Sequence, residues 1–550
     1  GHARCHRAKA TSEHLILGRR GVEFVDLESG HMVGNFWLRG ICQYGVLPAN
    51  GLLYLPPHSC VCSVGDMIKT GFAAFAPATE EDAAAQPEFA APLKRGPAFG
   101  FAPPKQAAAA QDSWPTYRRD QARSGATPTS ISHALQAAWT TDLGGKLTSP
   151  VVADRLLLVA ETDAHRIHAL NAATGEPAWS FTAGARVDSS PTIHEGRVLF
   201  GSADGHVYCL RLDDGALVWR FRAVPSDRRI VVDEQLESPW PVPGNVLVLD
   251  GAAYFSAGRN AYVDGGMFLY KLDAATGQTL ARMELAVEED KRNSGFAGAG
   301  CLPDVLSSDG KSLFMRSARF DLDLLRQKSD VPHLWSPVGF LDDRWWHRTY
   351  WQIGTTMKSG WGGWPKAGQE VPAGRLLVTD GARVFGFGRN QYDTPGAHVG
   401  VDADGVWGPI GRKQGRWTFY QLFRHELDLR SEKQSRRQSK DAPQDESDDW
   451  TRDVPVVVRA MVLADEVLFI AGPTHGVDEV PREPAASDPL AEALQPDRDG
   501  RLLAISTKDG KTLADYPLTS PPVFDGLAAA QGRLYFSTSG GEVVCMGPAR

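Results

Sequence analysis

The stretch HRIHALNAATGEPAWSF, residues 165–181, decides the fold. Its apolar residues alternate through Ile167 and Ala169, the chain then turns at Gly175, and Trp179 lies in a second short run. Apolar alternation with a period of two on both sides of a glycine-containing turn predicts a β-hairpin.

The same unit recurs along the chain. The further copies are VEFVDLESGHMVGNFWL (22–38), VYCLRLDDGALVWRFR (207–222), LYKLDAATGQTLARMEL (269–285) and LLAISTKDGKTLADYPL (502–518). A glycine closes every turn, and Gly175 and Gly215 are 40 residues apart. Around the first copy, LTSPVVAD, RLLLVAE, HRIHALN and PAWSF supply four short strands. Four strands in each repeat of about 40 residues predict the blades of an all-β propeller.

Length and composition fit one large repetitive domain. The chain has 550 residues, 42% of them hydrophobic, with 56 glycines and a formal net charge of -8. This charge gives no reason to expect nucleic acid as a partner. No run of about 18 apolar residues occurs, so no membrane span is expected. The start, GHARCHRAKAT, lacks the apolar core of a signal peptide, so we expect further domains and any export signal upstream.

Composition predicts three regions. Residues 1–76 are expected to form N-terminal propeller blades, residues 77–113 an Ala/Pro-rich linker without regular packing, and residues 114–550 the remaining blades with polar loops at 431–450 and 477–500. We expect eight four-stranded blades, with seven as the alternative. The loop at 431–450 mixes both charge signs and is expected to be solvated, with docking of a partner as its alternative.

The last repeat predicts how the ring closes. QGRLYFSTSGGEVVCMG (531–547) ends on strands without an outer partner, and an unpaired edge invites aggregation. The segment AAWTTDLG (137–144) has the pattern of an outer strand, but we expect the N-terminal residues 1–38 to complete this last blade.

The turns resemble a known repeat. NAATGEPAW (171–179) and LDAATGQTL (272–280) approximate A-x-D-x-x-T-G-x-x-x-W, and SWPTYRRDQARSG (113–125) precedes the first regular blade. Together they resemble the quinoprotein-like (PQQ-like) β-propeller repeat family, which includes quinone alcohol dehydrogenases and the propeller of an outer-membrane protein assembly lipoprotein. The resemblance implies an extracytoplasmic propeller in which the turn tryptophan packs between neighbouring blades.

The chain is also similar to the final portion of large propeller proteins of planctomycete-type bacteria, through PANGLLYLPP (48–57), GRNAYVDGG (258–266) and GFLDDRWWHRTYW (339–351). The quinone dehydrogenases stack their cofactor on a disulfide between adjacent cysteines, beside Ca²⁺ and an Asp base. In this chain Cys60 and Cys62 are separated by one residue. PQQ is therefore not expected to bind, and a quinone- or metal-dependent oxidoreductase is the third functional hypothesis.

Cysteines and histidines gather near the start of the chain. The candidate metal ligands are Cys5, His6, Cys42, His58, Cys60 and Cys62. Thiolates and imidazoles suit zinc or copper, but the spacing lacks C-x₂-C pairs, so disulfides such as Cys5 or Cys42 with one of the 60/62 pair are the alternative. The scattered Cys209, Cys301 and Cys545 are expected to be buried thiols.

A tryptophan-rich stretch at 338–365 is the main candidate site. Its candidate catalytic residues are His347, Arg348, Tyr350 and Lys358, and its candidate binding platforms are Trp346 and Trp351. Indole rings stack on sugars, a histidine can serve as general base, and cations neutralise a carboxylate. The alternative is that these side chains fill the central channel and contact one another.

Strand ends at 237–266 supply a third set. Its substrate-binding candidates are Trp240, Arg259, Tyr262 and Asp264, with Glu237 nearby. Arg316 and Arg319 belong to the same set. The alternative interpretation is structural, with Arg259 and Asp264 forming only an ion pair in a loop at the top of a blade.

Three functions follow from these patterns. The first is a periplasmic or extracellular module, part of a larger protein, that binds a glycan or a partner protein at its channel mouth. The second is a lyase or hydrolase acting on an acidic polysaccharide, with His347 as base, Tyr350 as acid and Arg348 as neutralising group. The third is the oxidoreductase named above.

Overall fold

The computed structural model describes residues 7–56 with gaps at 19–20, 36, 39 and 41–43. It continues through residues 72–77, 92–103, 112–286, 301–343, 350–355, 371–389, 399–401, 407–409, 420–427, 449–474 and 499–549. The described residues contain strands and no helix, which confirms the all-β class. Within them, no helix meets the length and hydropathy needed to cross a bilayer.

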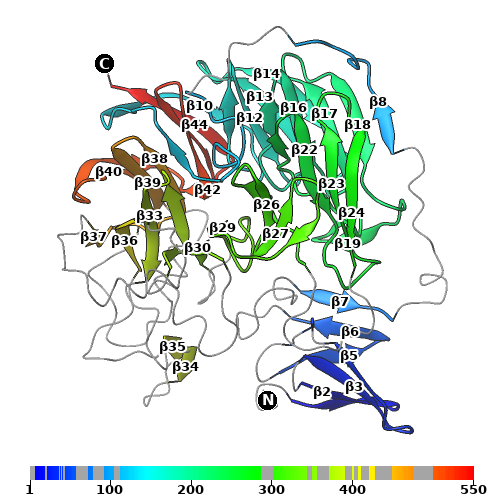
Figure 1. Ribbon diagram of the computed structural model, residues 1–550. Coiled ribbons are helices and arrows are strands. Elements are labelled where there is room, and N and C mark those ends of the chain that lie inside the picture. The colour runs from blue at the N-terminus through cyan, green and yellow to red at the C-terminus, as the bar shows by residue number, and fades with distance from the viewer. Residues whose placement is uncertain are drawn as a thin grey trace.

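Successive antiparallel sheets are arranged around a centre (Figure 1). The first four are β11 (Val151–Ala153), β12 (Leu156–Glu161), β13 (Arg166–Asn171) and β14 (Pro177–Thr182); β15 (Thr192–His194), β16 (Arg197–Gly201), β17 (His206–Arg211) and β18 (Leu217–Arg222); β21 (Leu247–Leu249), β22 (Ala252–Ala257), β23 (Met267–Asp273) and β24 (Thr279–Leu285); and β25 (Ser307–Ser308), β26 (Ser312–Met315), β27 (Ala318–Asp321) and β28 (Arg326–Gln327). A hairpin of β19 (Ile230–Val232) and β20 (Gln235–Glu237) lies between the second and third sheets in sequence.

Four further sheets follow. They are β29 (His333–Trp335), β30 (Trp351–Gly354) and β31 (Ala373–Gly374); β32 (Leu376–Thr379), β33 (Arg383–Arg389), β36 (Tyr420–Glu426) and β37 (Trp450–Arg452); β38 (Ala460–Ala464), β39 (Val467–Pro473), β40 (Gly500–Ser506) and β41 (Thr512–Leu518); and β42 (Pro522–Ala530), β43 (Arg533–Thr538) and β44 (Glu542–Pro548). A separate two-stranded sheet of β34 (Val399–Val401) and β35 (Trp407–Pro409) lies between β33 and β36 in sequence. Eight such sheets are present in the described residues, one with three strands, and the number of blades stays a prediction.

The ring closes through β10 (Leu135–Asp142). This strand pairs antiparallel with β44, from Leu135 opposite Pro548 to Asp142 opposite Glu542. The last sheet is therefore completed by residues that directly precede the first sheet, and the inner strands β38, β42 and β11 contact in turn. The prediction that residues 1–38 complete the last blade is wrong, because the described strands of that segment pair with one another.

The N-terminal residues form two small sheets beside the ring (Figure 1). These are β1 (Lys9–Ala10), β2 (His14–Leu17), β3 (Val22–Asp26) and β4 (Met32–Asn35), followed by β5 (Leu47–Ala49), β6 (Leu52–Leu55) and β7 (Ala73–Phe75). They meet the third sheet's loop where Trp37 stacks on Tyr262, with ring centroids 5.4 Å apart. The predicted boundaries at residues 76 and 113 stay a prediction.

Part of the expected linker is ordered. The strand β8 (Leu93–Arg95) adds a fifth strand to the second sheet, pairing with β18. Leu93, Phe99 and Phe101 pack against the same core, and a side chain at Gly96 would meet the Leu217 carbonyl. The expectation of no regular packing is therefore wrong for residues 92–103, because a few apolar side chains suffice to bind this segment to an existing sheet edge.

Neighbouring blades are joined by a tryptophan that packs on the next repeat's turn glycine. The pairs are Trp139 with Gly175, Trp179 with Gly215, Trp219 with Gly277 and Trp450 with Gly510. Each indole N–H also donates to a carbonyl of that next repeat, at 2.8 to 3.3 Å. The glycines have φ between +70° and +78°, where a Cβ is strained, and that Cβ would lie under 3 Å from the ring. This contact confirms the packing role that the resemblance implies for the tryptophan.

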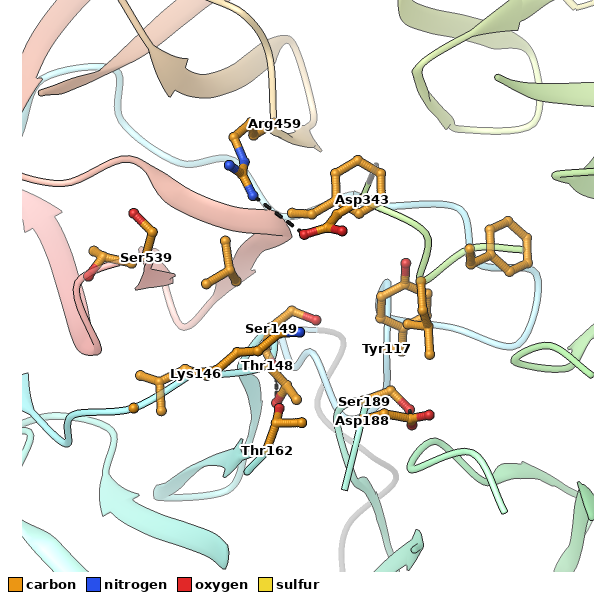
Figure 2. A pocket seen from close by; sticks show the side chains of 17 residues that line it. Tyr117, Lys146, Thr148, Ser149, Thr162, Asp188, Ser189, Asp343, Arg459 and Ser539 are labelled. Carbon is orange, nitrogen blue, oxygen red and sulfur yellow. Dashed lines mark hydrogen bonds and ion pairs between the residues drawn. The ribbon is translucent and has the colours of Figure 1, made fainter. Parts of the chain in front are cut away.

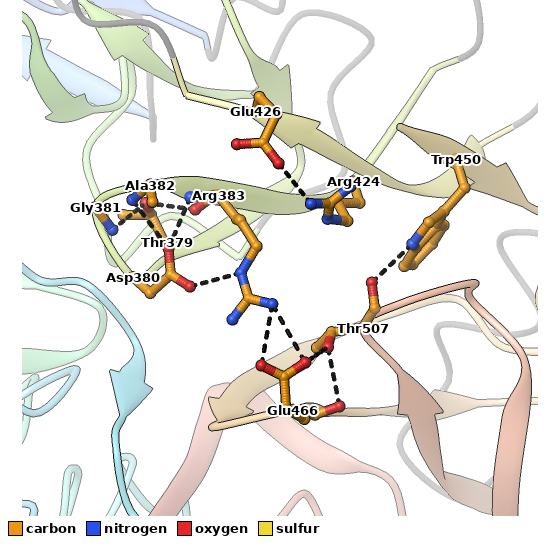
Figure 3. Close-up of polar contacts among 10 residues, drawn as sticks. All are labelled: Thr379, Asp380, Gly381, Ala382, Arg383, Arg424, Glu426, Trp450, Glu466 and Thr507. Carbon is orange, nitrogen blue, oxygen red and sulfur yellow. Dashed lines mark hydrogen bonds and ion pairs between the residues drawn. The ribbon is translucent and has the colours of Figure 1, made fainter. Parts of the chain in front are cut away.

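Figure 3 shows one of these junctions, between the sixth and seventh sheets. The Trp450 indole donates to the Thr507 carbonyl at 2.9 Å. Beside it, Arg383 pairs with Asp380 at 2.7 Å and reaches Glu466 of the next sheet at 3.4 Å. By contrast, the turn glycine of the N-terminal unit, Gly30, has φ +70°, and a Cβ added there would meet no described atom within 4 Å. The N-terminal repeat thus has the turn but not the packed neighbour.

Replacing Trp219 by Ala tests this contact. Its indole is fully buried between the second and third sheets, so truncation is expected to lower the free energy of unfolding by about 3 to 5 kcal/mol. Trp219→Phe keeps most of the apolar volume, so its free energy of unfolding should fall less than that of Trp219→Ala. Chemical denaturation of both variants measures the effect, and equal stability of Trp219→Ala and the wild type would contradict the account.

Candidate functional site

A cavity of about 520 Å³ lies at the centre of one face of the ring. At this face the innermost strand of a sheet, such as β11, begins, and the second strand of the sheet, such as β12, ends. Figure 2 shows the side chains that line it. They are Tyr117, Gly145, Lys146, Leu147, Thr148, Ser149, Thr162, Asp188, Ser189, Phe340, Leu341, Asp343, Arg459, Val523, Phe524, Thr538 and Ser539. Ser149 lies just before β11, Arg459 just before β38, and Phe524 in β42. Sheets far apart in sequence therefore share one site.

The cavity is bounded in part by the central segment, which we define as residues 113–127. Trp114 bridges to Val152 of the first sheet, and the Pro115 carbonyl accepts from Ile193 of the second. At its other end, β9 (Ala126–Thr127) runs parallel to β38 of the seventh sheet. The segment thus crosses the middle of the ring, and it carries Tyr117 to the cavity.

Arg118 fixes the central segment to two more sheets. Its guanidinium pairs with Asp525 at 2.7 Å, both side chains being almost fully buried, and donates to the Leu377 carbonyl. It also lies over the Trp351 ring, 4.6 Å from the centroid. Burial raises the pKa of the Asp525 carboxyl, and the Arg118 charge opposes that shift.

Arg123 makes the corresponding contacts on the other side. Its fully buried guanidinium donates to the Leu306 carbonyl at 2.7 and 2.9 Å and to the Asn245 side chain at 2.7 Å. Burial lowers the pKa of Arg123 to about 10, so the group stays charged at neutral pH. The carbonyl oxygens supply the partners that a buried cation requires.

The apolar side of the cavity contains aromatic rings. Phe340 and Trp351 meet edge to face at 5.1 Å, and Phe524 meets Trp351 in the same way at 6.0 Å. Trp351 and Phe340 are buried, whereas Phe524 is half-buried and exposes part of its ring. The Arg375 guanidinium covers Phe524 at 4.4 Å. Phe524 is thus the aromatic surface that the cavity offers to a ligand.

The polar side of the cavity carries charges of both signs. Arg459 lies 3.8 Å from Asp343. Farther along the wall, Asp188 accepts hydrogen bonds from the Gly244 amide at 2.7 Å and the Ser189 hydroxyl at 3.1 Å. The Asp188 side chain is exposed and lines the cavity. Desolvation raises the pKa of its carboxyl, and the two hydrogen bonds act against that rise.

Asp304 holds the loop that brings Phe340 to the cavity. Its carboxylate accepts from the amides of Phe340 at 3.0 Å and Val305 at 2.8 Å. The group is buried, and burial raises its pKa to about 6, against the nearby charges of Arg316 and Arg123.

The third set of predicted residues makes contacts within the protein, and its binding role stays a prediction. Trp240 is buried and donates to the Asp264 carbonyl at 3.0 Å, and Tyr262 is buried against Trp37. Arg259 pairs with Glu237 at 2.6 Å, and Asp264 pairs with Arg228. The Arg259–Asp264 ion pair of the alternative interpretation is therefore not observed. None of these residues lines the cavity.

The remaining predicted residues divide into described and undescribed ones. Arg316 donates to the carbonyls of Pro303 at 3.2 Å and Pro337 at 2.7 Å, and Arg319 pairs with Asp330 at 2.7 Å. Tyr350 and Trp351 are 2% and 0% exposed, so Trp351 is a core residue and not the surface platform expected for it. Trp346, His347, Arg348 and Lys358 lie outside the described residues, as do Cys5, His6, Cys42, His58, Cys60 and Cys62.

The described cysteines agree with the prediction. Cys209, Cys301 and Cys545 are all buried, and Cys209 and Cys545 are free thiols. Burial raises the pKa of the Cys209 and Cys545 thiols, so both stay protonated at neutral pH. Within the described residues no group of three or more His, Cys, Asp and Glu side chains could hold a metal ion.

Sequence reasoning missed the cavity's own residues. Arg459, Asp343, Phe524 and Asp188 were not singled out, because each is a common residue type in a turn or at a strand end. Two lining residues do lie in stretches that carry the family resemblance, since Asp343 belongs to GFLDDRWWHRTYW and Tyr117 to SWPTYRRDQARSG. These stretches could have drawn attention to the two residues.

Residues 131–317 match a family model of PQQ-like repeats described as outer membrane protein assembly factor BamB. This part of the chain consists of PQQ-like propeller repeats. The chain is 27% identical over 161 residues to BamB of Yersinia pestis, covering 28% of this chain and 38% of that protein. It is also 27% identical over 194 residues to the dehydrogenase subunit of a quinone alcohol dehydrogenase from Gluconobacter oxydans, covering 32% of this chain and 24% of that protein. The chain thus spans well under half the length of these relatives.

Among solved structures, the quinohemoprotein alcohol dehydrogenase of Comamonas testosteroni aligns with a TM-score of 0.46 at 13% identity, over 81% of this chain and 82% of that one. The PQQ-like repeats raise the question of the quinone cofactor. Among the described residues that line the cavity there is no cysteine, and the sequence has no adjacent cysteine pair on which the cofactor could stack. The residues present therefore do not fit the cofactor as the resemblance describes its site.

Asp304 gives the site a testable pH dependence. Its pKa is about 6 in the folded protein and about 3.9 in an unfolded chain. The folded state therefore holds this proton more tightly, so its stabilising contribution is complete below about pH 4 and is lost as the pH rises through about 6. Asp304→Asn keeps an acceptor oxygen but cannot ionise.

Between pH 4 and pH 7, the free energy of unfolding of the wild type should fall relative to that of Asp304→Asn by up to about 3 kcal/mol. Urea denaturation at both pH values measures this difference. The exposed Asp163, changed to Asn, serves as the control and should show little pH-dependent difference. A constant difference for Asp304→Asn would contradict the assignment.

Proposed function

We propose that the protein is an extracytoplasmic PQQ-like propeller module that binds a glycan in the central cavity. The observation that carries the proposal is the pairing of the partly exposed Phe524 ring with a wall of hydroxyl and charged side chains. A sugar has an apolar face that stacks on aromatic rings and an edge of hydroxyl groups that need polar partners. A volume of about 520 Å³ lies within the usual range of small-ligand sites.

The Ser149 hydroxyl in the wall retains hydrogen-bonding capacity. It contacts the Ser190 hydroxyl at 2.8 Å. Because a hydroxyl has one donor and two acceptor positions, this contact leaves room for a ligand. The contact also fixes the orientation of the Ser149 hydroxyl, which favours selective binding.

Binding is favoured over catalysis by the described residues. The polysaccharide-degrading hypothesis needs Tyr350 as its acid, and this side chain is 2% exposed. The family description names an assembly factor, which supports a protein partner as the second candidate. The β19–β20 hairpin exposes Val231 and Leu236, which suits such a contact.

Glycan binding is tested by screening the purified protein against an array of oligosaccharides and titrating the best binder by calorimetry. Phe524→Ala should weaken that binding about tenfold or more, because the stacking surface is lost. Phe101→Ala is the matched control, since this half-buried ring also lies under an arginine, Arg197, but outside the cavity. If no oligosaccharide binds the wild type, or if both variants bind it equally well, the proposal fails.

A further inference from the structure

The strongest unused binding capacity in the cavity belongs to Arg459. Its side chain is 17% exposed and reaches the cavity from the residue that precedes β38. Its contact with Asp343, at 3.8 Å, is too long for a hydrogen bond. No hydrogen bond of this guanidinium occurs within the described residues, so its N–H donors can serve a ligand in the cavity that it lines.

The other buried arginines of the ring centre differ in this respect. Arg118 and Arg123 each donate to several carbonyl or carboxylate oxygens. Arg375 donates to the Asp342 carbonyl at 3.1 Å and covers Phe524. These three guanidinium groups hold the structure together. Arg459 instead faces open volume, and desolvation lowers its pKa while Asp343 acts in the opposite direction.

Asp343 occupies the position that a ligand carboxylate would take. Its side chain is 51% exposed, and Figure 2 shows its carboxylate directed at the adjacent Arg459 guanidinium. A guanidinium and a carboxylate in direct contact form two parallel hydrogen bonds at about 2.7 to 2.9 Å. The 3.8 Å separation shows that Asp343 neutralises Arg459 without making this pair. An external carboxylate with freedom to align can make it.

We propose that the ligand is a sugar acid whose carboxylate binds Arg459 in place of Asp343, while its ring stacks on Phe524. This inference rests on the proposed function and names the ligand class of the same site. The aromatic ring and the guanidinium line one cavity, together with Lys146, whose exposed ammonium adds a second cation. The hydroxyl-rich wall favours a sugar over a peptide as the carrier of the carboxylate.

Displacement of Asp343 makes an unusual prediction, because removing an acidic residue from the site should strengthen binding of an acid. In Asp343→Asn the competing charge is gone, so tri-galacturonate should bind about three- to tenfold more tightly than to the wild type. Arg459→Met should bind it at least tenfold more weakly, and Arg459→Lys should recover part of the loss. Binding of neutral galactotriose should change little in all three variants.

Calorimetric titration of the full chain with tri-galacturonate, galactotriose and a tri-glutamate peptide tests the proposal. Lys508→Ala, in the β40–β41 turn at the opposite strand ends, is the control and should bind as the wild type does. Thermal melts confirm that each variant is folded. If Arg459→Met does not fold, the Asp343→Asn result decides alone, because this residue is exposed.

The outcomes separate the two proposals. Tighter binding of tri-galacturonate by Asp343→Asn, with galactotriose unchanged, supports the sugar-acid site. Equal affinity of the wild type for the acidic and neutral sugars overturns this inference and leaves glycan binding in place. Binding of the peptide in preference to both sugars also overturns it. If the protein binds none of the three ligands and no oligosaccharide on the array, both the sugar-acid proposal and the glycan-binding proposal are overturned.

Discussion

The structure depends on the buried guanidinium groups of the central segment. Arg118 joins that segment to Asp525 of the last sheet and to the Leu377 carbonyl of the sixth, and Arg123 joins it to the third and fourth. A buried charge is costly unless it is paired, so removing either side chain would leave carboxylate or carbonyl oxygens without partners. The two arginines therefore fix the sheets to a common centre, whereas the tryptophan–glycine contacts join each sheet only to its neighbour.

The cavity is a consequence of this arrangement. The central segment occupies the middle of the ring and carries Tyr117, and the space that remains is enclosed by the ends of inner and second strands. Most of its lining residues lie in the loops that flank these strands. Asp304 fixes one of these loops, because its carboxylate accepts a hydrogen bond from the Phe340 amide. Arg459 and Asp343, held by different sheets, can face each other without forming a close pair.

Much of the fold was predictable, and most of the site was not. Turn glycines such as Gly175, followed by Trp179, give a local signal that repeats, so the propeller followed from sequence. Closure did not, because residues 1–38 and 137–144 have the same strand pattern and only the observed pairing of β10 with β44 separates them. Trp240 and Tyr262 looked like binding residues because of their type, yet they are buried. Arg459 carries no local signal, and Asp343 stands out only because it belongs to the stretch 339–351. Their proximity is visible only once segments far apart in sequence come together.

The central functional claim is that a ligand carboxylate takes the place of Asp343 beside Arg459. A crystal structure of the protein with tri-galacturonate tests it most directly. The account predicts a sugar carboxylate within about 3 Å of two Arg459 nitrogen atoms, a sugar ring against Phe524, and the Asp343 side chain turned away. A sugar bound elsewhere on the protein, or bound in the cavity with the Arg459–Asp343 contact retained, would contradict it.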